Sequence, residues 1–125
     1  VTAQARPESE WLADYRQATE ASRRTGRPLF IDFTGYTCTN CRWMEQNMFT
    51  RPAVAQRLAE CIRLRLHTDR PVQPDLGNKE IQQSRFDSIE LPLYALIAPD
   101  ERVLGTSSFT RSEAEFLSFL DRASH

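Results

Sequence analysis

The chain has 125 residues, of which 40% are hydrophobic and 26% charged, and its formal net charge is −1 at pH 7. These values fit a single folded domain and exclude a wholly disordered chain. The near-zero charge offers no basic surface for nucleic acid. The longest apolar run, 93–98, is far shorter than the roughly 18 residues of a membrane span, and three cysteines are too few for a disulfide framework.

The first predicted elements are a tail, a helix and a buried strand. Residues 1–8 are expected to be a polar tail, and 9–125 the folded domain. Ser9 is the expected cap of a first helix that contains Trp11 and ends at Gly26. The nearly continuous apolar run over 29–33 predicts a strand covered on both faces.

A second helix is predicted to begin at Cys38 and to stop before Pro52, with Thr50 capping a short further helix. Residues 61–67 then alternate strictly between apolar and other residues, which predicts a half-exposed strand near a sheet edge. On that strand, Arg63 and Arg65 are expected to form a solvated face.

The remaining chain predicts a loop over 68–78, a short helix from the cap Asn78 to Phe86, and strands over 93–98 and 102–104. Residues 110–113 have the form of a capping box before a last helix, which is expected to bury Phe116, Leu117 and Leu120. The order α-β-α-β-α-β-β-α predicts an α/β fold with a central mixed β-sheet flanked by helices on both faces.

The strongest chemical signal is the sequence Cys38-Thr39-Asn40-Cys41, directly after a strand and a turn. Cysteines three residues apart in a first helical turn can form a disulfide without distortion. Free N–H groups at a helix start stabilise a thiolate on the first cysteine. We therefore expect Cys38 to be the exposed attacking thiol and Cys41 the inner, resolving thiol.

A zinc site is the first alternative for these cysteines, with Cys61 and His67 as the other two ligands. Six residues of a strand span about 20 Å, so Cys61 and His67 cannot reach one ion unless the strand is broken. A purely structural disulfide is the second alternative. Cys61 is expected to be a buried structural thiol and His67 a surface residue.

The stretch from Pro28 to Glu45, PLFIDFTGYTCTNCRWME, resembles the active-site region of the thioredoxin superfamily. More narrowly, it resembles the C-terminal periplasmic thioredoxin-like domain of DsbD-type thiol:disulfide interchange proteins. The resemblance extends over roughly residues 9–122. It implies a thioredoxin fold, with parallel pairing of the first two strands and an antiparallel hairpin at the end.

The resemblance also implies roles for three further residues. Asp32 stands where the superfamily has a buried acid beneath the cysteines, and Glu45 where DsbD-type domains have a second acid. A buried carboxylate has a raised pKa and could exchange a proton with Cys41, whereas negative charge nearby opposes thiolate formation on Cys38. Pro92 stands where the superfamily has a cis-proline, which presents the backbone of Leu91 to a partner.

Each of these residues also has a plainer interpretation. Asp32 could face water at a strand end, and Glu45 could be an ordinary exposed helix residue. Tyr36 and Trp43 flank the motif and could line a docking surface. For Trp43, packing in the core is an equally good alternative. Thr37, the dipeptide Thr39-Asn40 and Leu93 differ from the residues that are common in the superfamily, so the redox potential and the choice of partner stay open.

The expected function is that of a thiol:disulfide oxidoreductase domain that relays electrons between protein partners, without metal or organic cofactor. The chain lacks an initiator methionine and a signal peptide, which indicates a mature form or an excised domain. The resemblance implies a periplasmic location and excision from a larger membrane protein, and we expect a monomer. A transmembrane electron-carrier domain of that protein is one expected partner. The alternatives are a stand-alone thioredoxin-like reductase or isomerase, and a thioredoxin-fold binding module whose disulfide is only structural.

Overall fold

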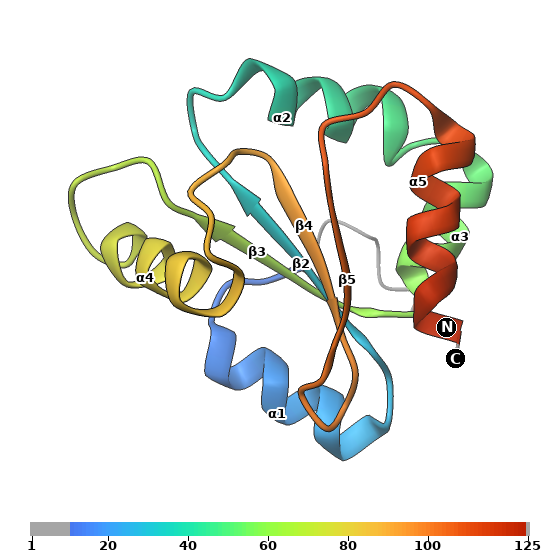
Figure 1. Ribbon diagram of the computed structural model, residues 1–125, viewed down its shortest axis with the longest axis horizontal. Helices are drawn as coiled ribbons and strands as arrows, with labels where there is room; N and C mark the ends of the chain where they lie inside the picture. Colours follow the sequence, from blue (N-terminus) through green and yellow to red (C-terminus); the bar gives the residue numbers. More distant parts are fainter. Residues whose placement is uncertain (1–10, 125) are drawn as a thin grey trace, which may run out of the picture.

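A single five-stranded mixed sheet forms the centre of the molecule (Figure 1). The computed structural model describes residues 11–124, so the predicted tail and the expected cap Ser9 lie outside the described residues. The strands lie in the order β1-β3-β2-β4-β5. They are β1 (Trp11–Leu12), β2 (Leu29–Thr34), β3 (Ile62–His67), β4 (Leu93–Ile97) and β5 (Val103–Ser108).

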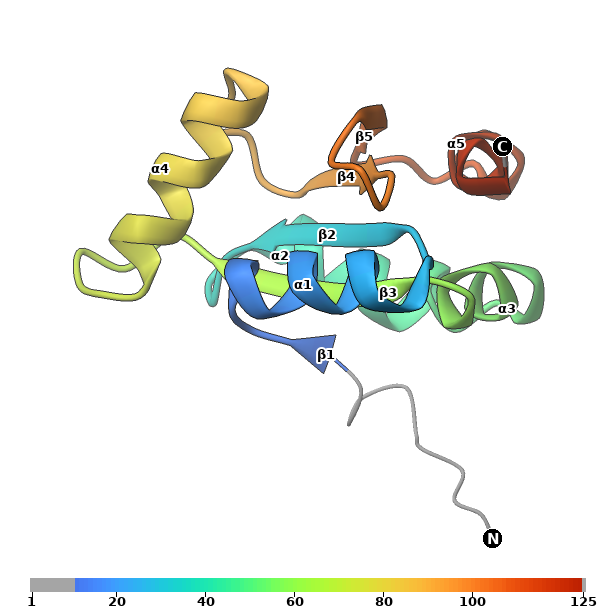
Figure 2. The same cartoon turned by 90° about the horizontal axis from the view of Figure 1, so that it is seen from below.

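The strand pairing agrees with the pattern that the family resemblance implied. β2 pairs in parallel with β3, and β4 pairs antiparallel with both β2 and β5. The short strand β1, which was not predicted, pairs in parallel with β3 and covers its outer edge (Figure 2). β3 is therefore the second strand of the sheet, which agrees with the predicted place near a sheet edge, and β1 covers only Arg63 and Leu64 on its outer side.

Helices cover both faces of the sheet, as the sequence predicted (Figure 1). One face carries α1 (Tyr15–Thr25) and α4 (Asp75–Phe86). The other carries α2 (Thr39–Trp43), its π-helical continuation η2 (Met44–Met48), α3 (Pro52–Ala59), α5 (Glu113–Leu120) and the 3-10 turn η3 (Asp121–Ser124). Among the described residues, no helix combines the length and the apolar character that crossing a membrane requires.

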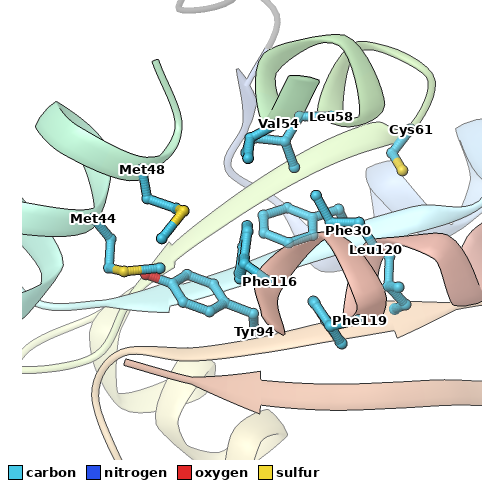
Figure 3. Packing of buried hydrophobic residues seen from close by; sticks show 11 residues of the cluster. Phe30, Met44, Met48, Val54, Leu58, Cys61, Tyr94, Phe116, Phe119 and Leu120 are labelled. Carbon is cyan, nitrogen blue, oxygen red and sulfur yellow. The ribbon is translucent and has the colours of Figure 1, made fainter. Parts of the chain in front are cut away.

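The two faces bury two separate cores. On the side of α1 and α4 the core is mainly aliphatic and includes Leu29, Ile31 and Leu64. On the side of α2, α3 and α5 it is aromatic (Figure 3). There Phe30 stacks on Tyr94 with ring centroids 5.7 Å apart and meets Phe116 edge-on at 6.5 Å. All residues of β2 are buried, which confirms the prediction of a strand covered on both faces.

Capping residues explain where several helices begin and end. α1 begins at Tyr15, because the side chain of Asp14 accepts a hydrogen bond from the N–H of Gln17. The prediction of a helix that contains Trp11 was therefore wrong. The predicted end at Gly26 is confirmed: its φ of 75° is left-handed, and its N–H donates to the carbonyl of Ser22.

Three other expected caps are displaced. Arg51 occupies the N-cap position of α3 without a capping hydrogen bond from its side chain, while the Thr50 hydroxyl donates back to the Gln46 carbonyl. α4 begins at Asp75, so it takes in the end of the predicted loop, and the amide of Asn78 donates to the carbonyl of His67. A capping box over 110–113 would have Thr110 as its N-cap, whereas the N-cap of α5 is Ser112, whose hydroxyl accepts a hydrogen bond from the N–H of Glu115.

The last helix and the last strand also differ in detail from the prediction. α5 buries Phe116 and Leu120 as expected, but Phe119 is buried in place of Leu117. β5 extends to Ser108, well past the predicted end at Leu104. This longer strand pairs with the whole of β4 and completes the sheet on that side.

Candidate active site

The two cysteines of the motif lie at the start of α2, directly after the loop that follows β2. Cys38 is the N-cap of α2 and forms a disulfide with Cys41, with the two Cα atoms 5.2 Å apart. The backbone N–H of Cys41 also donates to Sγ of Cys38 at 3.1 Å. Cys38 is partly exposed, whereas only 1% of Cys41 is exposed. The outer cysteine is therefore the accessible one, and its sulfur already accepts a helix N–H.

The loop that leads to Cys38 is held by Asp69, which sequence reasoning did not identify. Its carboxylate accepts hydrogen bonds from the Thr37 N–H at 3.1 Å and the Thr37 hydroxyl at 3.2 Å. A Cβ on Gly35 would lie 2.8 Å from the Asp69 carboxylate and 3.1 Å from Leu91, so any larger residue there would displace the Asp69 side chain. Desolvation would raise the pKa of Asp69, but the hydrogen bonds from Tyr36 and Thr37 hold it below its ordinary value.

Tyr36 lies against the end of β3 and the loop that follows it. Its ring stacks on His67 with centroids 3.8 Å apart, and the guanidinium carbon of Arg70 lies 4.4 Å from the ring centroid. Arg70 is in turn held by Asp75 at 2.9 Å. Tyr36 nevertheless remains 49% exposed. His67 thus supports the loop before Cys38 by packing, and its burial lowers its pKa.

Asp32 is buried on β2, and only 1% of it is exposed, so its prediction as a buried acid is confirmed. Nε of Arg65, on β3, donates to its carboxylate at 3.0 Å. Burial raises the pKa of Asp32 to about 6, although the charge and hydrogen bond of Arg65 oppose the rise. Glu45 contributes further to the rise and Arg42 opposes it.

Glu45 lies one turn past Cys41 on η2, and a quarter of its side chain is exposed. It pairs with Arg42 at 2.9 Å. Arg42 also donates to the Thr34 hydroxyl at 3.1 Å and to the Tyr36 carbonyl at 3.4 Å. Arg42 therefore fastens α2 to the end of β2, and its charge partly offsets that of Glu45.

The segment before β4 reaches the same end of the sheet. Leu93 is the register partner of Phe33, near the end of β2 that leads to the motif. The Leu91–Pro92 bond is cis, as the resemblance implies, and a second cis bond joins Gln73 and Pro74. Leu91 is half-buried against the loop at Gly35, while Thr39 and Asn40 are exposed on the first turn of α2.

The four residues considered as zinc ligands do not come together: three lie near the start of α2, and Cys61 lies at the opposite end of β3. Cys38 and Cys41 are bonded to each other, and His67 stacks on Tyr36 near them. Cys61 precedes the opposite end of β3 and packs in the aromatic core, where burial raises its pKa to about 11. Within residues 11–124, no group of three or more potential metal ligands comes together.

Arg65 and Tyr94 were also missed as residues of this region. Arg65 was assigned to a solvated face, but it pairs with Asp32 and its guanidinium carbon lies 3.9 Å from the ring centroid of Trp11. Arg63, from the same predicted face, is only 5% exposed. Tyr94 is the register partner of Asp32 and points toward Met44 (Figure 3). Its pKa is raised by burial and by the charge of Asp32.

Comparison with known proteins agrees with this architecture. The model of a family described as thioredoxin-like matches residues 10–99. The chain belongs to the thioredoxin-like family. No curated protein matches the sequence.

Solved structures agree at the level of the fold. A thioredoxin from Thermus thermophilus has a TM-score of 0.74 at 20% identity, covering 91% of this chain and 86% of that one. The DsbH oxidoreductase has a TM-score of 0.69 at 19% identity, covering 97% and 90%. The oxidised DsbD C-terminal domain of Neisseria meningitidis has a TM-score of 0.70 at 14% identity, covering 90% and 98%. The predicted thioredoxin fold, and its likeness to a DsbD C-terminal domain, are confirmed.

Proposed function

We propose that this thioredoxin-like chain is a thiol:disulfide oxidoreductase that exchanges electrons with protein partners through Cys38 and Cys41. The observation that carries the proposal is the disulfide between a partly exposed cysteine at a helix N-cap and a buried cysteine one turn further. This asymmetry gives the two sulfurs different tasks. A partner protein can reach Cys38, which is partly exposed. Cys41 is buried, so its sulfur can react only with the neighbouring sulfur of Cys38.

The proposed reaction is two successive thiol–disulfide exchanges. In the reduced chain, the Cys38 thiolate attacks one sulfur of a partner disulfide, and the other partner sulfur leaves as a thiolate. Cys41 then loses its proton and attacks Sγ of Cys38, which releases the first partner sulfur. Two electrons pass to the partner, which gains two thiols, while the chain gains its Cys38–Cys41 disulfide. The reverse sequence reduces the chain again.

Asp32 and Glu45 are proposed to manage the protons of this exchange. A carboxyl with a pKa of about 6 is present in both protonation states near neutral pH, so Asp32 can accept the Cys41 proton and return it. The negative charge of Glu45 contributes to the raised pKa of Asp32, but its pairing with Arg42 limits this effect. Both residues are therefore proposed to influence how readily each thiol ionises.

Leu91, Pro92, Tyr36, Thr39 and Asn40 are proposed to form the surface on which the partner lies. Tyr36, Thr39 and Asn40 are exposed, and Leu91, which precedes Pro92, lies against the loop at Gly35 that leads to Cys38. The finer role we propose is a relay like that of a DsbD C-terminal domain on the periplasmic side of the inner membrane, with a transmembrane carrier as one partner. The likeness to DsbD and DsbH structures supports this role.

Measuring the redox equilibrium of the cysteine pair tests the proposal against a purely structural disulfide. We expect a potential within the range of known dithiol proteins, about −270 to −120 mV, whereas structural disulfides typically lie below about −300 mV. The reduced chain should also reduce bis(2-hydroxyethyl) disulfide in a single turnover. Cys38→Ser should abolish this reaction, and Cys61→Ala should leave it unchanged. A potential below about −300 mV, or no reduction of the small disulfide by the wild-type chain, would overturn the proposal.

A further inference from the structure

The helix α4 buries an unusual set of side chains. Three of its residues are buried, and all three are polar: Asp75, Asn78 and Gln82. A helix that packs on a sheet normally turns an apolar stripe toward it. In α4, only the partly buried Ile81 and Phe86 pack against the core on that side. The innermost face of α4 therefore consists of hydrogen-bonding groups.

Two of these side chains hold the end of β3 and the loop that follows it. The amide of Asn78 donates to the carbonyl of His67 at 2.9 Å. The carboxylate of Asp75 accepts the N–H of Arg70 at 3.1 Å. The backbone of 67–70 is thus bonded to α4 at both of its ends.

The third side chain, Gln82, holds the segment 88–91 that precedes Pro92. Its Nε2 donates to the carbonyl of Glu90 at 2.7 Å. In the described part of the chain, the other hydrogen bond that reaches the main chain of this segment is local, because the Ser88 hydroxyl accepts the N–H of Glu90. Gln82 therefore supplies the hydrogen bond that ties this segment to another element.

The two segments held by α4 converge on Gly35, three residues before Cys38. A Cβ on Gly35 would lie 2.8 Å from Asp69 and 3.1 Å from Leu91, so both segments contact the loop that carries the motif. Asp69 also accepts hydrogen bonds from Thr37. The loops on either side of α4 lie at the same end of the sheet as the start of α2 (Figure 1). α4 therefore sets the spacing between the loop before Cys38 and the segment that carries Leu91.

The side chain of Gln82 is not the one that would favour stability most. It is fully buried, and its Oε1 forms no hydrogen bond with any described residue. A buried acceptor without a partner lowers stability. An apolar side chain of the same length would avoid this loss, but it would release the carbonyl of Glu90. The amide thus fixes one arrangement of the segment at the expense of stability.

From these observations we infer that Gln82 is a positioning residue for disulfide exchange with protein partners. It keeps Leu91 at a fixed place relative to Cys38, so that a partner chain lying beside Leu91 presents its disulfide to the sulfur of Cys38. Gln82 acts through this segment and takes no part in the exchange itself. The inference rests on the proposed oxidoreductase function.

Single-turnover reduction of two disulfides tests the inference. One is bis(2-hydroxyethyl) disulfide, which is too small to lie along the segment of Leu91. The other is the disulfide dimer of a short uncharged peptide with blocked ends, in which alanine and serine flank a central cysteine. Gln82→Met keeps the length of the side chain but has no donor. It should lower the rate on the peptide about tenfold and leave the rate on the small disulfide unchanged, since a misplacement of about 1 Å can cost up to about 100-fold.

Ser22→Ala is the matched control. Ser22 is also buried, and its hydroxyl also donates to a main-chain carbonyl, that of Arg27. This bond lies after α1, at the start of β2, whereas the cysteine motif follows the end of β2. Ser22→Ala therefore removes a buried hydrogen bond without touching the segments at the motif, and it should keep the wild-type rate on both disulfides.

Amide signals in a ¹⁵N–¹H NMR spectrum give a second measurement that a general loss of stability would not produce. The signals of Gly35 and Leu91 should move in Gln82→Met and stay in place in Ser22→Ala. Unmoved signals in Gln82→Met would contradict the positioning role.

The rates separate this inference from the function on which it rests. An unchanged peptide rate in Gln82→Met, or an equal fall on both disulfides, would overturn the inference while the oxidoreductase function stands. A similar selective fall in Ser22→Ala would also overturn it, because any lost buried bond would then have this effect. Failure of the wild-type chain to reduce even bis(2-hydroxyethyl) disulfide would overturn the proposed function instead.

Discussion

Arg65 donates a hydrogen bond of 3.0 Å to the buried carboxylate of Asp32, while its guanidinium lies 3.9 Å from the ring centroid of Trp11. The stacking of Arg65 on Trp11 depends on β1, because Trp11 is the register partner of Arg63 on the adjacent strand. A two-residue strand thus helps to hold the cation that pairs with the buried acid Asp32. Burial still dominates, and the pKa of Asp32 is raised to about 6.

The raised pKa of Asp32 predicts how stability depends on pH. A buried group whose pKa rises from 3.8 to about 6 on folding stabilises the folded chain below about pH 4, and this stabilisation is lost as the pH rises through 6. The loss is on the order of 3 kcal/mol. Asp32→Asn removes the ionisation. Between pH 4 and pH 8, the free energy of unfolding of the variant should therefore rise relative to that of the wild type by about this amount.

Urea unfolding of the oxidised protein at several pH values measures this difference and keeps cysteine titration out of the comparison. Subtracting the two unfolding free energies cancels the other carboxylates, including Asp69, whose pKa is lowered. A constant difference across this pH range would contradict the raised pKa of Asp32.

Arg65 is predicted to limit the rise of the Asp32 pKa. Arg65→Met removes the charge and the hydrogen bond that both lower it, so the pH midpoint of the stability change should move above 6. Arg65→Lys should restore part of the shift, since it keeps the charge. Arg102→Met is the control, because Arg102 pairs with Asp100 on the exposed hairpin. An unchanged midpoint in Arg65→Met would mean that the ion pair does not act on Asp32 in solution.

Sequence periodicity predicted the main elements of the sheet because they carry long, regular signals. The apolar run over 29–33 predicted β2, and the motif at Cys38 predicted the start of α2. The parallel pairing of β2 with β3 followed from the family resemblance. β1 could not be predicted in this way, since two residues define no period. Without β1, the strand at 62–67 looks like an edge strand.

The same missing strand explains the error at Arg63 and Arg65. Alternation with leucines marks these arginines as the polar face of β3, but it does not show what lies against that face. Trp11 and Asp32, each more than thirty residues away in sequence from Arg65, supply its contacts. Asp69 was missed for a similar reason, because a loop acid gives no periodic signal and its partner Thr37 lies on another element.

Asp32 is expected to affect thiolate formation at Cys38 more strongly than Glu45 does. Both carboxylates oppose a nearby negative charge and each is paired with an arginine, but Glu45 is partly exposed and screened by solvent, whereas Asp32 is buried. In the reduced protein, Asp32→Asn should therefore shift the midpoint of thiolate absorbance to lower pH, and Glu45→Gln should shift it less. An equal or larger effect of Glu45→Gln would show that solvent does not screen its charge.

Phe30 is predicted to be a major determinant of stability. It is fully buried and contacts the rings of Trp11, Tyr94 and Phe116, so it joins β1, β4 and α5. Phe30→Ala should lower the free energy of unfolding by about 3–5 kcal/mol, and Phe30→Leu by less, because the cavity is smaller. Tyr36→Ala is a suitable control, since half of that ring is already exposed. A loss below about 1 kcal/mol in Phe30→Ala would contradict this role.

The division of labour between the cysteines is predicted from their exposure. In Cys41→Ser, a partner disulfide can still be attacked by the partly exposed Cys38, but no thiol remains to resolve the mixed disulfide. A cysteine peptide supplied as its disulfide should therefore stay covalently attached to this variant, as non-reducing mass spectrometry would show. In Cys38→Ser, the remaining thiol of Cys41 is only 1% exposed and should trap little peptide. More adduct on Cys38→Ser than on Cys41→Ser would reverse the assignment, because it would mean that partners reach the inner sulfur first.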